Sequence, residues 1–174
     1  NQPPVVISPI ENTILYGIED QVSFDMSKYM KDEDDETLDY SCRGYDSKIL
    51  SYSVNGKMLI FKTLGYGLTP VTVVGTDGGG KECSTSFDIL VKDKGNPVEA
   101  YPNPVRNKLN IRTEAPAETT IRIVSSTGAV IYNSSSVVGA FAPAVVDMSK
   151  CSPGVYGLTV SYSGRSVSRS IVKR

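Results

Sequence analysis

Apolar and polar residues alternate with a period of two along most of this chain, in short runs separated by clusters of Gly, Asn, Pro and Ser. Such runs, recurring every ~8–12 residues, are typical of antiparallel β-sandwiches, and no window favours a helix. The pattern predicts strands in the first half at Val5–Ser8, Val22–Asp25, Leu38–Arg43, Ile49–Ser53, Met58–Lys62, Val71–Thr76 and Cys83–Val91. It predicts strands in the second half at Leu109–Arg112, Thr119–Ser125, Ala129–Asn133, Val137–Val146, Val155–Ser161 and Val167–Lys173.

The same alternation predicts which side of a strand faces the core, because successive side chains of a strand point to opposite faces of its sheet. Cys83 shares an apolar face with Phe87, and Cys42 shares one with Leu38. We therefore expect both cysteines to point inward. The predicted fold class is all-β, with two tandem immunoglobulin-like antiparallel β-sandwiches.

The distribution of charge favours two domains. Residues 1–96 hold nine Lys and Arg against 15 Asp and Glu, a net charge of −6, whereas residues 97–174 hold nine against four, a net charge of +5. The sign changes at the polar run 92–97, which contains Gly and Pro and is typical of a linker. We therefore expect an immunoglobulin-like domain at 1–93, a linker at 94–96 and a second sandwich in the rest.

The composition excludes much catalytic chemistry. The chain has no histidine, so neither a Ser-His-Asp triad nor a Cys-His pair can form, and imidazole metal ligands are lacking. Cys42, Cys83 and Cys151 are far apart and include no C-x-x-C pair, which argues against structural zinc and thiol redox chemistry. We expect no enzymatic activity in this chain and no nucleic-acid partner.

The chain also shows no membrane or export signal at its beginning. No apolar run approaches the ~20 residues that span a bilayer, so we expect no transmembrane segment. The first residues, Asn1-Gln2-Pro3-Pro4, lack the charged and apolar regions of a signal peptide and are typical of an interdomain linker. We therefore expect a fragment of a longer polypeptide whose main domain, the passenger, lies upstream.

The second half carries an ordered series of short motifs: Tyr101-Pro102-Asn103-Pro104, Leu109-Asn110-Ile111, Ile121-Arg122-Ile123-Val124, Gly128-Ala129-Val130-Ile131, Val146-Asp147-Met148-Ser149, Ser152-Pro153-Gly154-Val155-Tyr156 and Ser170-Ile171-Val172-Lys173. In order and spacing the series resembles the type A sorting domain of the type IX secretion system of Bacteroidetes, and the resemblance covers 97–174. It implies export across the outer membrane to the cell surface and recognition of the folded domain by secretion machinery proteins. It also implies, for most members, removal of the domain with surface attachment of the passenger.

The candidate residues of the sorting motif are Tyr101, Pro102, Asn103, Pro104, Gly128, Pro153, Gly154, Tyr156, Lys173 and Arg174. Each also has a purely structural interpretation, because prolines stiffen the chain, glycines permit turns and a tyrosine packs or donates a hydrogen bond at a sandwich corner. The basic terminal strand offers an exposed edge to a partner. Alternatively, its charges only protect an edge strand against aggregation.

The first half is similar to cadherin-like or bacterial immunoglobulin-like repeats. The similarity is carried by Asn1-Gln2-Pro3-Pro4-Val5, by 24–40 with its acidic run, and by Val71-Thr72-Val73-Val74-Gly75-Thr76-Asp77-Gly78. Such modules act as spacers or mediate adhesion, and some bind calcium between repeats. The alternative function is therefore cell-surface adhesion through the first domain, with a surface glycan or a host protein as partner.

The acidic run Asp32-Glu33-Asp34-Asp35-Glu36 contains the hard oxygen ligands that calcium prefers. It is not an EF-hand, because its sixth and twelfth positions lack the Gly and Glu of that loop. A cadherin-like site would combine Asp32 and Asp34 with Asp77 from a distant loop. The alternative is a solvated loop without metal, and we expect no other cofactor.

Cys42 and Cys83 have two possible states. They form a disulfide, since exported proteins pass an oxidising compartment, or they remain buried thiols that pack as small apolar groups. Nothing in the sequence places their Cα atoms within the ~7 Å that a bridge requires, so the thiol state is favoured.

Overall fold

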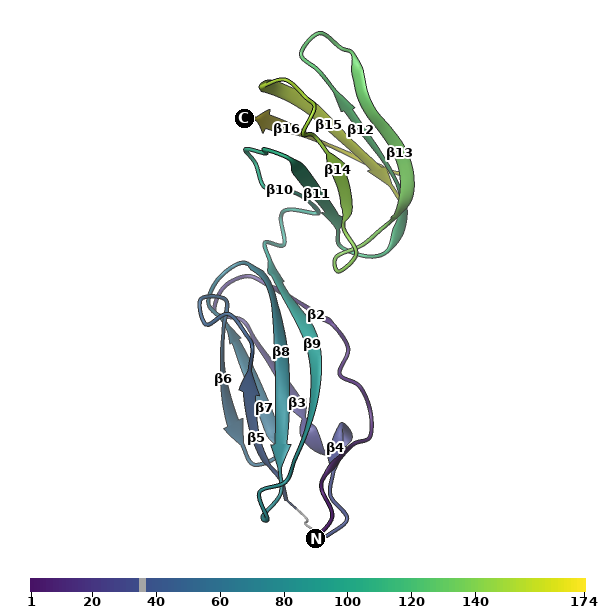
Figure 1. Cartoon of the computed structure of the whole chain (residues 1–174). Coiled ribbons are helices and arrows are strands. Elements are labelled where there is room, and N and C mark those ends of the chain that lie inside the picture. The colour runs from purple at the N-terminus through teal and green to yellow at the C-terminus, as the bar shows by residue number, and fades with distance from the viewer. Residues whose placement is uncertain (35–36) are drawn as a thin grey trace. The chain divides into compact units, whose positions relative to one another are not determined.

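The computed structural model describes residues 1–34 and 37–174 and divides into two compact units, Asn1–Lys94 (unit 1) and Gly95–Arg174 (unit 2) (Figure 1). Strands supply the regular structure of both units, which confirms the all-β prediction. The helical structure among these described residues is the short 3-10 helix η1 (Met26–Lys28), which the sequence pattern does not predict. No helix in the same ranges is long and apolar enough to cross a membrane.

Unit 1 is a sandwich of two main sheets, with strand orders β2-β9-β8-β5 and β3-β7-β6, accompanied by the short pair β1-β4. All its paired strands are antiparallel except β2 and β9, which run parallel. This arrangement is the expected immunoglobulin-like sandwich. The strands are β1 (Val5–Val6), β2 (Thr13–Tyr16), β3 (Gln21–Asp25), β4 (Met30–Lys31), β5 (Asp39–Arg43), β6 (Leu50–Asn55), β7 (Met58–Thr63), β8 (Gly67–Thr76) and β9 (Glu82–Lys92).

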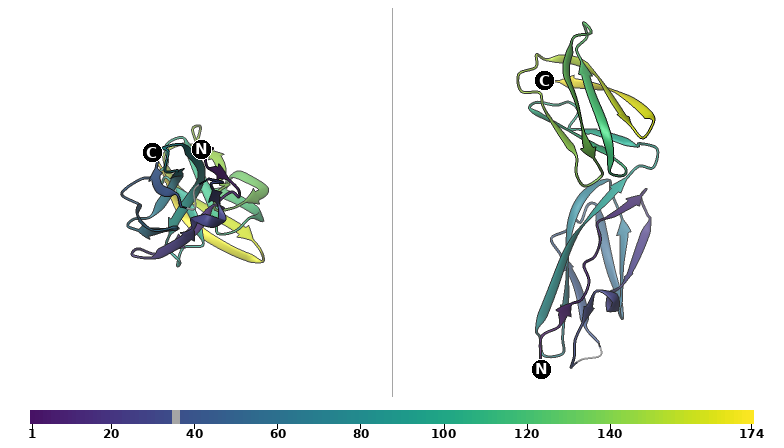
Figure 2. Two further views of the ribbon diagram at one scale, coloured as in Figure 1. Left: turned by 90° about the horizontal axis from the view of Figure 1, so that it is seen from below. Right: turned by 90° about the vertical axis from the view of Figure 1, so that its right-hand side faces the viewer.

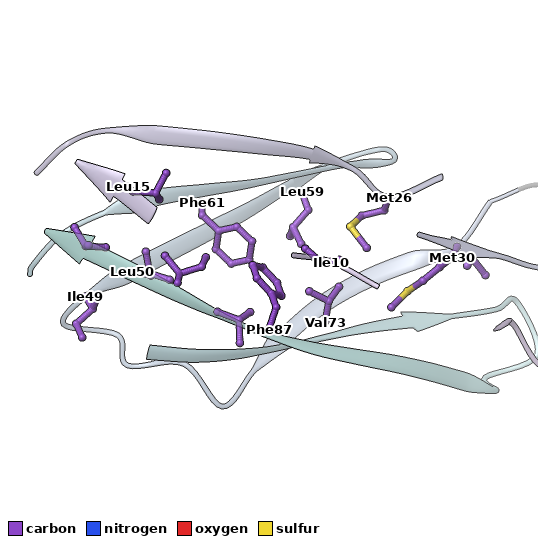
Figure 3. Packing of buried hydrophobic residues seen from close by; sticks show 14 residues of the cluster. Ile10, Leu15, Met26, Met30, Ile49, Leu50, Leu59, Phe61, Val73 and Phe87 are labelled. Carbon is purple, nitrogen blue, oxygen red and sulfur yellow. The ribbon is translucent and has the colours of Figure 1, made fainter. Parts of the chain in front are cut away.

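An aromatic cluster fills the space between the sheets of unit 1. Phe61 on β7 and Phe87 on β9 come from opposite sheets, and their ring centroids lie 6.2 Å apart with the planes at 75° (Figure 3). Phe24 contacts both rings edge-on, at 6.0 Å and 5.6 Å. Edge-to-face pairs of this kind add about 0.5–1.5 kcal/mol each beyond the burial of their area. Unit 1 therefore has a hydrophobic core of its own.

Unit 2 is a second sandwich, made of the sheets β10-β11-β14 and β13-β12-β15-β16, and Figure 2 shows its two layers from further directions. Its core includes Leu109, Ile111, Ile123, Leu158 and Ile171, which are all at most 1% exposed. Both sheets contribute to this core, so unit 2 also buries an interior without the other unit. The strands are β10 (Val98–Tyr101), β11 (Lys108–Thr113), β12 (Ala117–Val124), β13 (Val130–Val138), β14 (Ala144–Asp147), β15 (Gly154–Tyr162) and β16 (Arg165–Lys173).

The strand predictions fail where elements are short or where a loop is apolar. The pattern does not predict β2, β4 and β10, which have only two to four residues and so show little alternation. The predicted strand Val137–Val146 is wrong, because β13 ends at Val138 and β14 begins at Ala144. Between them the N–H of Gly139 donates to the carbonyl of Ala142 at 3.1 Å, which closes a turn whose residues are themselves apolar.

Candidate functional site

The terminal strand β16 is set in place by the hairpin that precedes it. Ser163 and Gly164 both have positive φ, 46° and 71°, as the two central residues of a tight hairpin turn require. β16 then pairs with β15 along its whole length, from Arg165 opposite Tyr162 to Lys173 opposite Gly154. Its other side would be a free edge if nothing else covered it.

The side-chain amide of Asn103 covers part of that edge. Its Nδ2 donates to the carbonyl of Ser170 at 2.9 Å, and its Oδ1 accepts from the N–H of Val172 at 2.9 Å. The amide therefore occupies the two ladder positions that a neighbouring strand would otherwise fill. A side-chain amide has one acceptor and two donors, so a single asparagine can satisfy both backbone groups.

The backbone of Val105 continues this cover toward the end of the chain. Its N–H donates to the carbonyl of Val172 at 2.8 Å, and its carbonyl accepts from the N–H of Arg174 at 2.9 Å, which forms a parallel bridge to Lys173. The Val105 side chain is fully buried in the core of unit 2. We call the contact of Asn103 and Val105 with residues 170–174 the clasp.

The segment before the clasp is itself anchored. The side chain of Asn110 on β11 donates to the carbonyl of Tyr101 at 3.2 Å, and the Arg112 guanidinium lies 4.5 Å from the centre of the Tyr101 ring. Arg112 also donates to the Tyr101 hydroxyl and lies 3.8 Å from Glu99. The peptide bonds before Pro102 and Pro104 are both cis. Tyr101 thus has a structural role, and Pro102, Asn103 and Pro104 are left exposed on the surface.

The motif at Pro153, Gly154 and Tyr156 lies on the other side of β16. Tyr156 pairs with Ile171 in the sheet, and its hydroxyl donates to the carbonyl of Ser152 at 2.7 Å, which closes the corner before β15. Its ring is 8% exposed. The structure therefore brings this motif and the clasp together on neighbouring strands.

A shallow groove of about 530 Å³ runs over this part of unit 2, lined by Val124, Ser125, Ser126, Val155, Tyr156, Gly157, Ser168, Arg169 and Ser170. Ser170 belongs both to the groove and to the clasp, which makes the two features continuous. Gly128 does not line the groove. Gly128 supports the turn between β12 and β13, which begins beside the groove. Its φ is 84°, and its N–H donates to the Ser125 carbonyl at 3.0 Å.

The prediction of an exposed basic edge is only partly correct. Lys173 is 8% exposed, because its strand position faces inward, and its ammonium donates to the carbonyl of Arg174. Arg169 is half-buried and donates to Asn96 Oδ1 at 2.9 Å and to the carbonyl of Ser168 at 3.0 Å. Of Arg169, Lys173 and Arg174, only Arg174 has an exposed side chain.

The proposed calcium ligands of unit 1 do not form a metal-binding group. Among the residues that the structure describes, no three His, Cys, Asp or Glu side chains are placed to hold a metal ion; Asp35 and Glu36 of the acidic run lie outside them. Asp32 and Asp34 do lie close together, since Asp32 Oδ1 accepts from the N–H of Asp34 at 2.7 Å. Asp77 instead closes the β8–β9 hairpin by accepting from the N–H groups of Gly79 and Lys81, both at 2.8 Å.

The disulfide between Cys42 and Cys83 is absent, and both cysteines are free. They lie in one sheet on β5 and β9, the two strands that flank β8, opposite Val73 and Gly75. Two strand spacings separate them by about 9.5 Å laterally, which exceeds the reach of a bridge. Burial raises the pKa of the Cys42 thiol to about 12 and also raises the pKa of Cys83, so these are packed thiols rather than reactive ones.

Unit 1 contains a pocket of about 510 Å³ between η1, β4, β5 and the β6–β7 turn. Apolar walls from Met30, Leu38 and Tyr40 face polar groups from Asp39 and Lys57. Burial raises the pKa of the Tyr40 hydroxyl above its usual value. The sequence pattern did not indicate this pocket, because its lining comes from four separate segments.

Sequence reasoning also missed several residues of the clasp. Val105, Ser170 and Val172 contribute through backbone groups, which leave no mark in the side-chain pattern. Asn96 lies in the stretch assigned to the linker, yet it holds Arg169. The signal available in the sequence was the presence of both a Pro-Asn-Pro opening and a strand motif at 170–173 in one ordered series, which indicates a relation but not its geometry.

The fold and the site together define unit 2 as a β-sandwich whose opening and closing segments form one surface, accessible to a protein partner. Residues 99–174 match the family of the secretion system C-terminal sorting domain, and this part of the chain is such a domain. The resemblance to the type IX sorting domain is thereby confirmed. The family indicates export by the secretion system to the cell surface.

Solved structures of low sequence identity align with the whole chain. Dimeric latent PorU from Porphyromonas gingivalis is 13% identical over 99% of this chain and 20% of PorU, with a TM-score of 0.33. The D00-D0 domain of intimin is 13% identical over 99% of this chain and 98% of its own length, with a TM-score of 0.45. Titin A168–A169 is 11% identical over 99% and 98%, with a TM-score of 0.43. Comparison with curated proteins finds no match.

Proposed function

We propose that the clasp and the adjoining groove are the surface by which secretion machinery proteins recognise unit 2, and that this recognition delivers an upstream passenger to the outside of the cell. The observation that carries the proposal is the double hydrogen bond of Asn103 to Ser170 and Val172. It joins the first and the last motif of the sorting domain in one place. The proposed surface therefore exists only in the folded domain.

The chemistry of this surface suits a partner with both apolar and acidic groups. Val155 and Val172 lie directly opposite each other on β15 and β16 and are 54% and 39% exposed. Arg174 is exposed beside them. An exposed apolar pair with an adjacent cation is the composition of a small protein-binding patch, in which the apolar area supplies affinity and the charge supplies orientation.

Export of a reporter fused in front of the chain tests the proposal. Deletion of Ile171–Arg174 should abolish surface delivery, but it also removes a core residue, so a gentler variant is needed. Val155→Asp places a charge on the exposed patch without touching the core and should reduce export severalfold while thermal unfolding is unchanged. Val145→Asp, at an exposed valine on β14 outside the patch, is the matched control.

Normal surface delivery of the Val155→Asp fusion would show that the patch is not recognised. Equal loss of export in Val155→Asp and Val145→Asp would show that the machinery responds to any added charge on unit 2. Only a selective effect of Val155→Asp supports recognition at the clasp and groove.

We propose that unit 1 acts as a spacer between the passenger and the sorting domain. Its pocket supports a second candidate function, adhesion through a surface glycan, because apolar walls beside carboxylate and ammonium groups suit a sugar ring and its hydroxyls. A glycan array with the whole chain tests this function. Binding that Asp39→Ala abolishes and Asp88→Ala retains would support it, and the absence of any bound glycan would leave unit 1 as a spacer only.

A further inference from the structure

Strand β13 is an outer strand of the sheet β13-β12-β15-β16. It pairs with β12 along Ala117–Val124, and no strand of the described ranges borders its other side. Within β13 (Val130–Val138) the outer side of the backbone is therefore left without a strand partner, except at Val138, which is buried and whose carbonyl accepts from the Thr113 hydroxyl at 2.9 Å. Such a row of N–H and C=O groups can pair with another strand.

The other long edge of the same sheet is protected by charges and by the clasp, whereas β13 has only a β-bulge near its beginning, at Ile131. β16 carries Arg165, Arg169 and Lys173, and the clasp covers its final residues. Charged residues, proline, short length and β-bulges are the usual means by which an edge strand avoids pairing with another chain. β13 has nine residues without one charge or proline. The uncharged edge strands of the two main sheets of unit 1, β2 and β6, are shorter, with four and six residues.

The exposed side chains of β13 are apolar at both ends and hydroxylic in the middle. Val130, Ile131 and Val137 are 50%, 39% and 65% exposed. The stretch Asn133-Ser134-Ser135-Ser136 lies between them and is exposed throughout. The order of residue types is nearly the same when the strand is followed in either direction from Ser134.

We propose that β13 pairs with β13 of a second copy of this chain, antiparallel about a two-fold axis at Ser134, so that the two four-stranded sheets become continuous. In this register Ile131 lies opposite Val137 of the second copy, and the β-bulge at Ile131, where the pairing of β13 with β12 shifts register, ends the regular pairing there. Asn133 lies opposite Ser135, and Tyr132 opposite Ser136. The two-fold makes every pair occur twice except Ser134 with itself.

This self-pairing is complementary because it opposes no like charges. Apolar residues meet apolar residues, and amide or hydroxyl groups meet hydroxyl groups. The charges nearest to β13 are on β12, where Arg122 pairs with Asn133 and Glu118 pairs with Val137. In the joined sheet Arg122 would lie in line with the Ser135 hydroxyl of the second copy. A contact limited to one strand edge is small, so the dimer is weak and reversible.

Sedimentation of the whole chain over a micromolar to submillimolar range tests the proposal. The unaltered chain should show a reversible monomer–dimer equilibrium. Ser134→Lys opposes two lysines at the two-fold and should raise the dimer Kd roughly fivefold, since like charges directly opposite on paired strands are destabilising. Ser134→Asp should weaken the dimer in the same way. An equimolar mixture of the two variants should restore dimer, because each lysine then meets an aspartate.

Ser166→Lys is the matched control, because Ser166 is an exposed serine near the start of β16, on the opposite edge of the sheet. It should leave the dimer Kd unchanged, and thermal unfolding should show that all variants are folded. A chain that stays monomeric at every concentration would overturn the proposal. So would a dimer that Ser134→Lys leaves intact, or a mixture of the lysine and aspartate variants that fails to associate.

Discussion

Hydrogen bonds from single side chains close corners and turns in both units, and these hydrogen bonds differ in how far they are shielded from water. The Tyr156 hydroxyl donates to the Ser152 carbonyl from a ring that is almost fully buried, and Asp77 accepts two backbone N–H groups inside a hairpin. Buried or multiple hydrogen bonds of this kind are worth more than bonds on an open surface. These residues therefore yield sharp predictions.

Tyr156→Phe should lower the free energy of unfolding of unit 2 by about 1–1.5 kcal/mol, because it removes the hydroxyl and leaves the Ser152 carbonyl without this donor. Urea unfolding checks the value. Tyr132→Phe is the control, because no hydrogen bond of its hydroxyl occurs among the described residues. Equal stability of the Tyr156→Phe and unaltered chains would show that water replaces the bond.

Asp77→Asn should reduce the loss of stability that unit 1 shows as the pH falls. Burial raises the pKa of Asp77, but hydrogen bonds from the backbone of Lys81 and Gly79 outweigh it, so the folded-state pKa lies below 3.8. Stability that depends on this carboxylate is complete above its unfolded pKa of about 3.9 and is lost as the pH falls through the lower folded value. Urea midpoints near about pH 5 and about pH 3 should differ less in Asp77→Asn than in the unaltered chain.

Asp88→Asn serves as the control for that experiment, because the Asp88 carboxylate lies on the outer face of β9 and accepts no hydrogen bond from the described part of the chain. Its pH dependence should match that of the unaltered chain. If both variants changed the acid response equally, general charge and not the hairpin would be responsible.

Residue roles were predictable from the sequence only where they depend on local spacing. The turn at Gly128 and the corner at Tyr156 follow from nearby residues, so the sequence indicates them. The role of Asn103 does not, since its partners lie 67 and 69 positions away. The state of Cys42 and Cys83 stayed open in the sequence, with thiols favoured, for the same reason: alternation gives the face of a residue but not the number of strands between two residues.

At the scale of elements, β16 depends on contacts from outside its own hairpin. Asn103→Ala should remove the two side-chain hydrogen bonds that take the place of a neighbouring strand beside β16. Amide hydrogen exchange at Val172 should then increase by about 10-fold or more, because two exposed hydrogen bonds are worth about 1–2 kcal/mol together. Exchange at Leu158, in the centre of the sheet, should not change. The measurement is residue-resolved hydrogen exchange by NMR.

Asn107→Ala is the control for this prediction, as Asn107 is exposed and only its backbone carbonyl is used, by the N–H of Met148. Unchanged exchange at Val172 in Asn103→Ala would mean that the backbone of Val105 alone holds the strand.

Element boundaries were harder to predict than element type, because β13 and β14 are separated by an apolar turn that continues the strand pattern.

At the scale of the whole molecule, each unit has its own core and its own sheets. We expect trypsin to cut first after Lys94, which is exposed between the units, and to release two fragments that each unfold cooperatively. Mass spectrometry and thermal unfolding of the separated fragments check this. First cleavage inside β16, or a fragment without a cooperative transition, would contradict it.

The clasp also has a consequence for the order of events during synthesis. Asn103 is 67 positions from Ser170 and 69 positions from Val172, so nearly all of unit 2 must have left the ribosome before Asn103 can contact β16. A ribosome that stalls before this strand releases a chain on which the proposed recognition surface does not exist. If the proposed surface is what the secretion machinery recognises, chains with a folded unit 2 would be exported and truncated chains would not, without a separate quality-control protein.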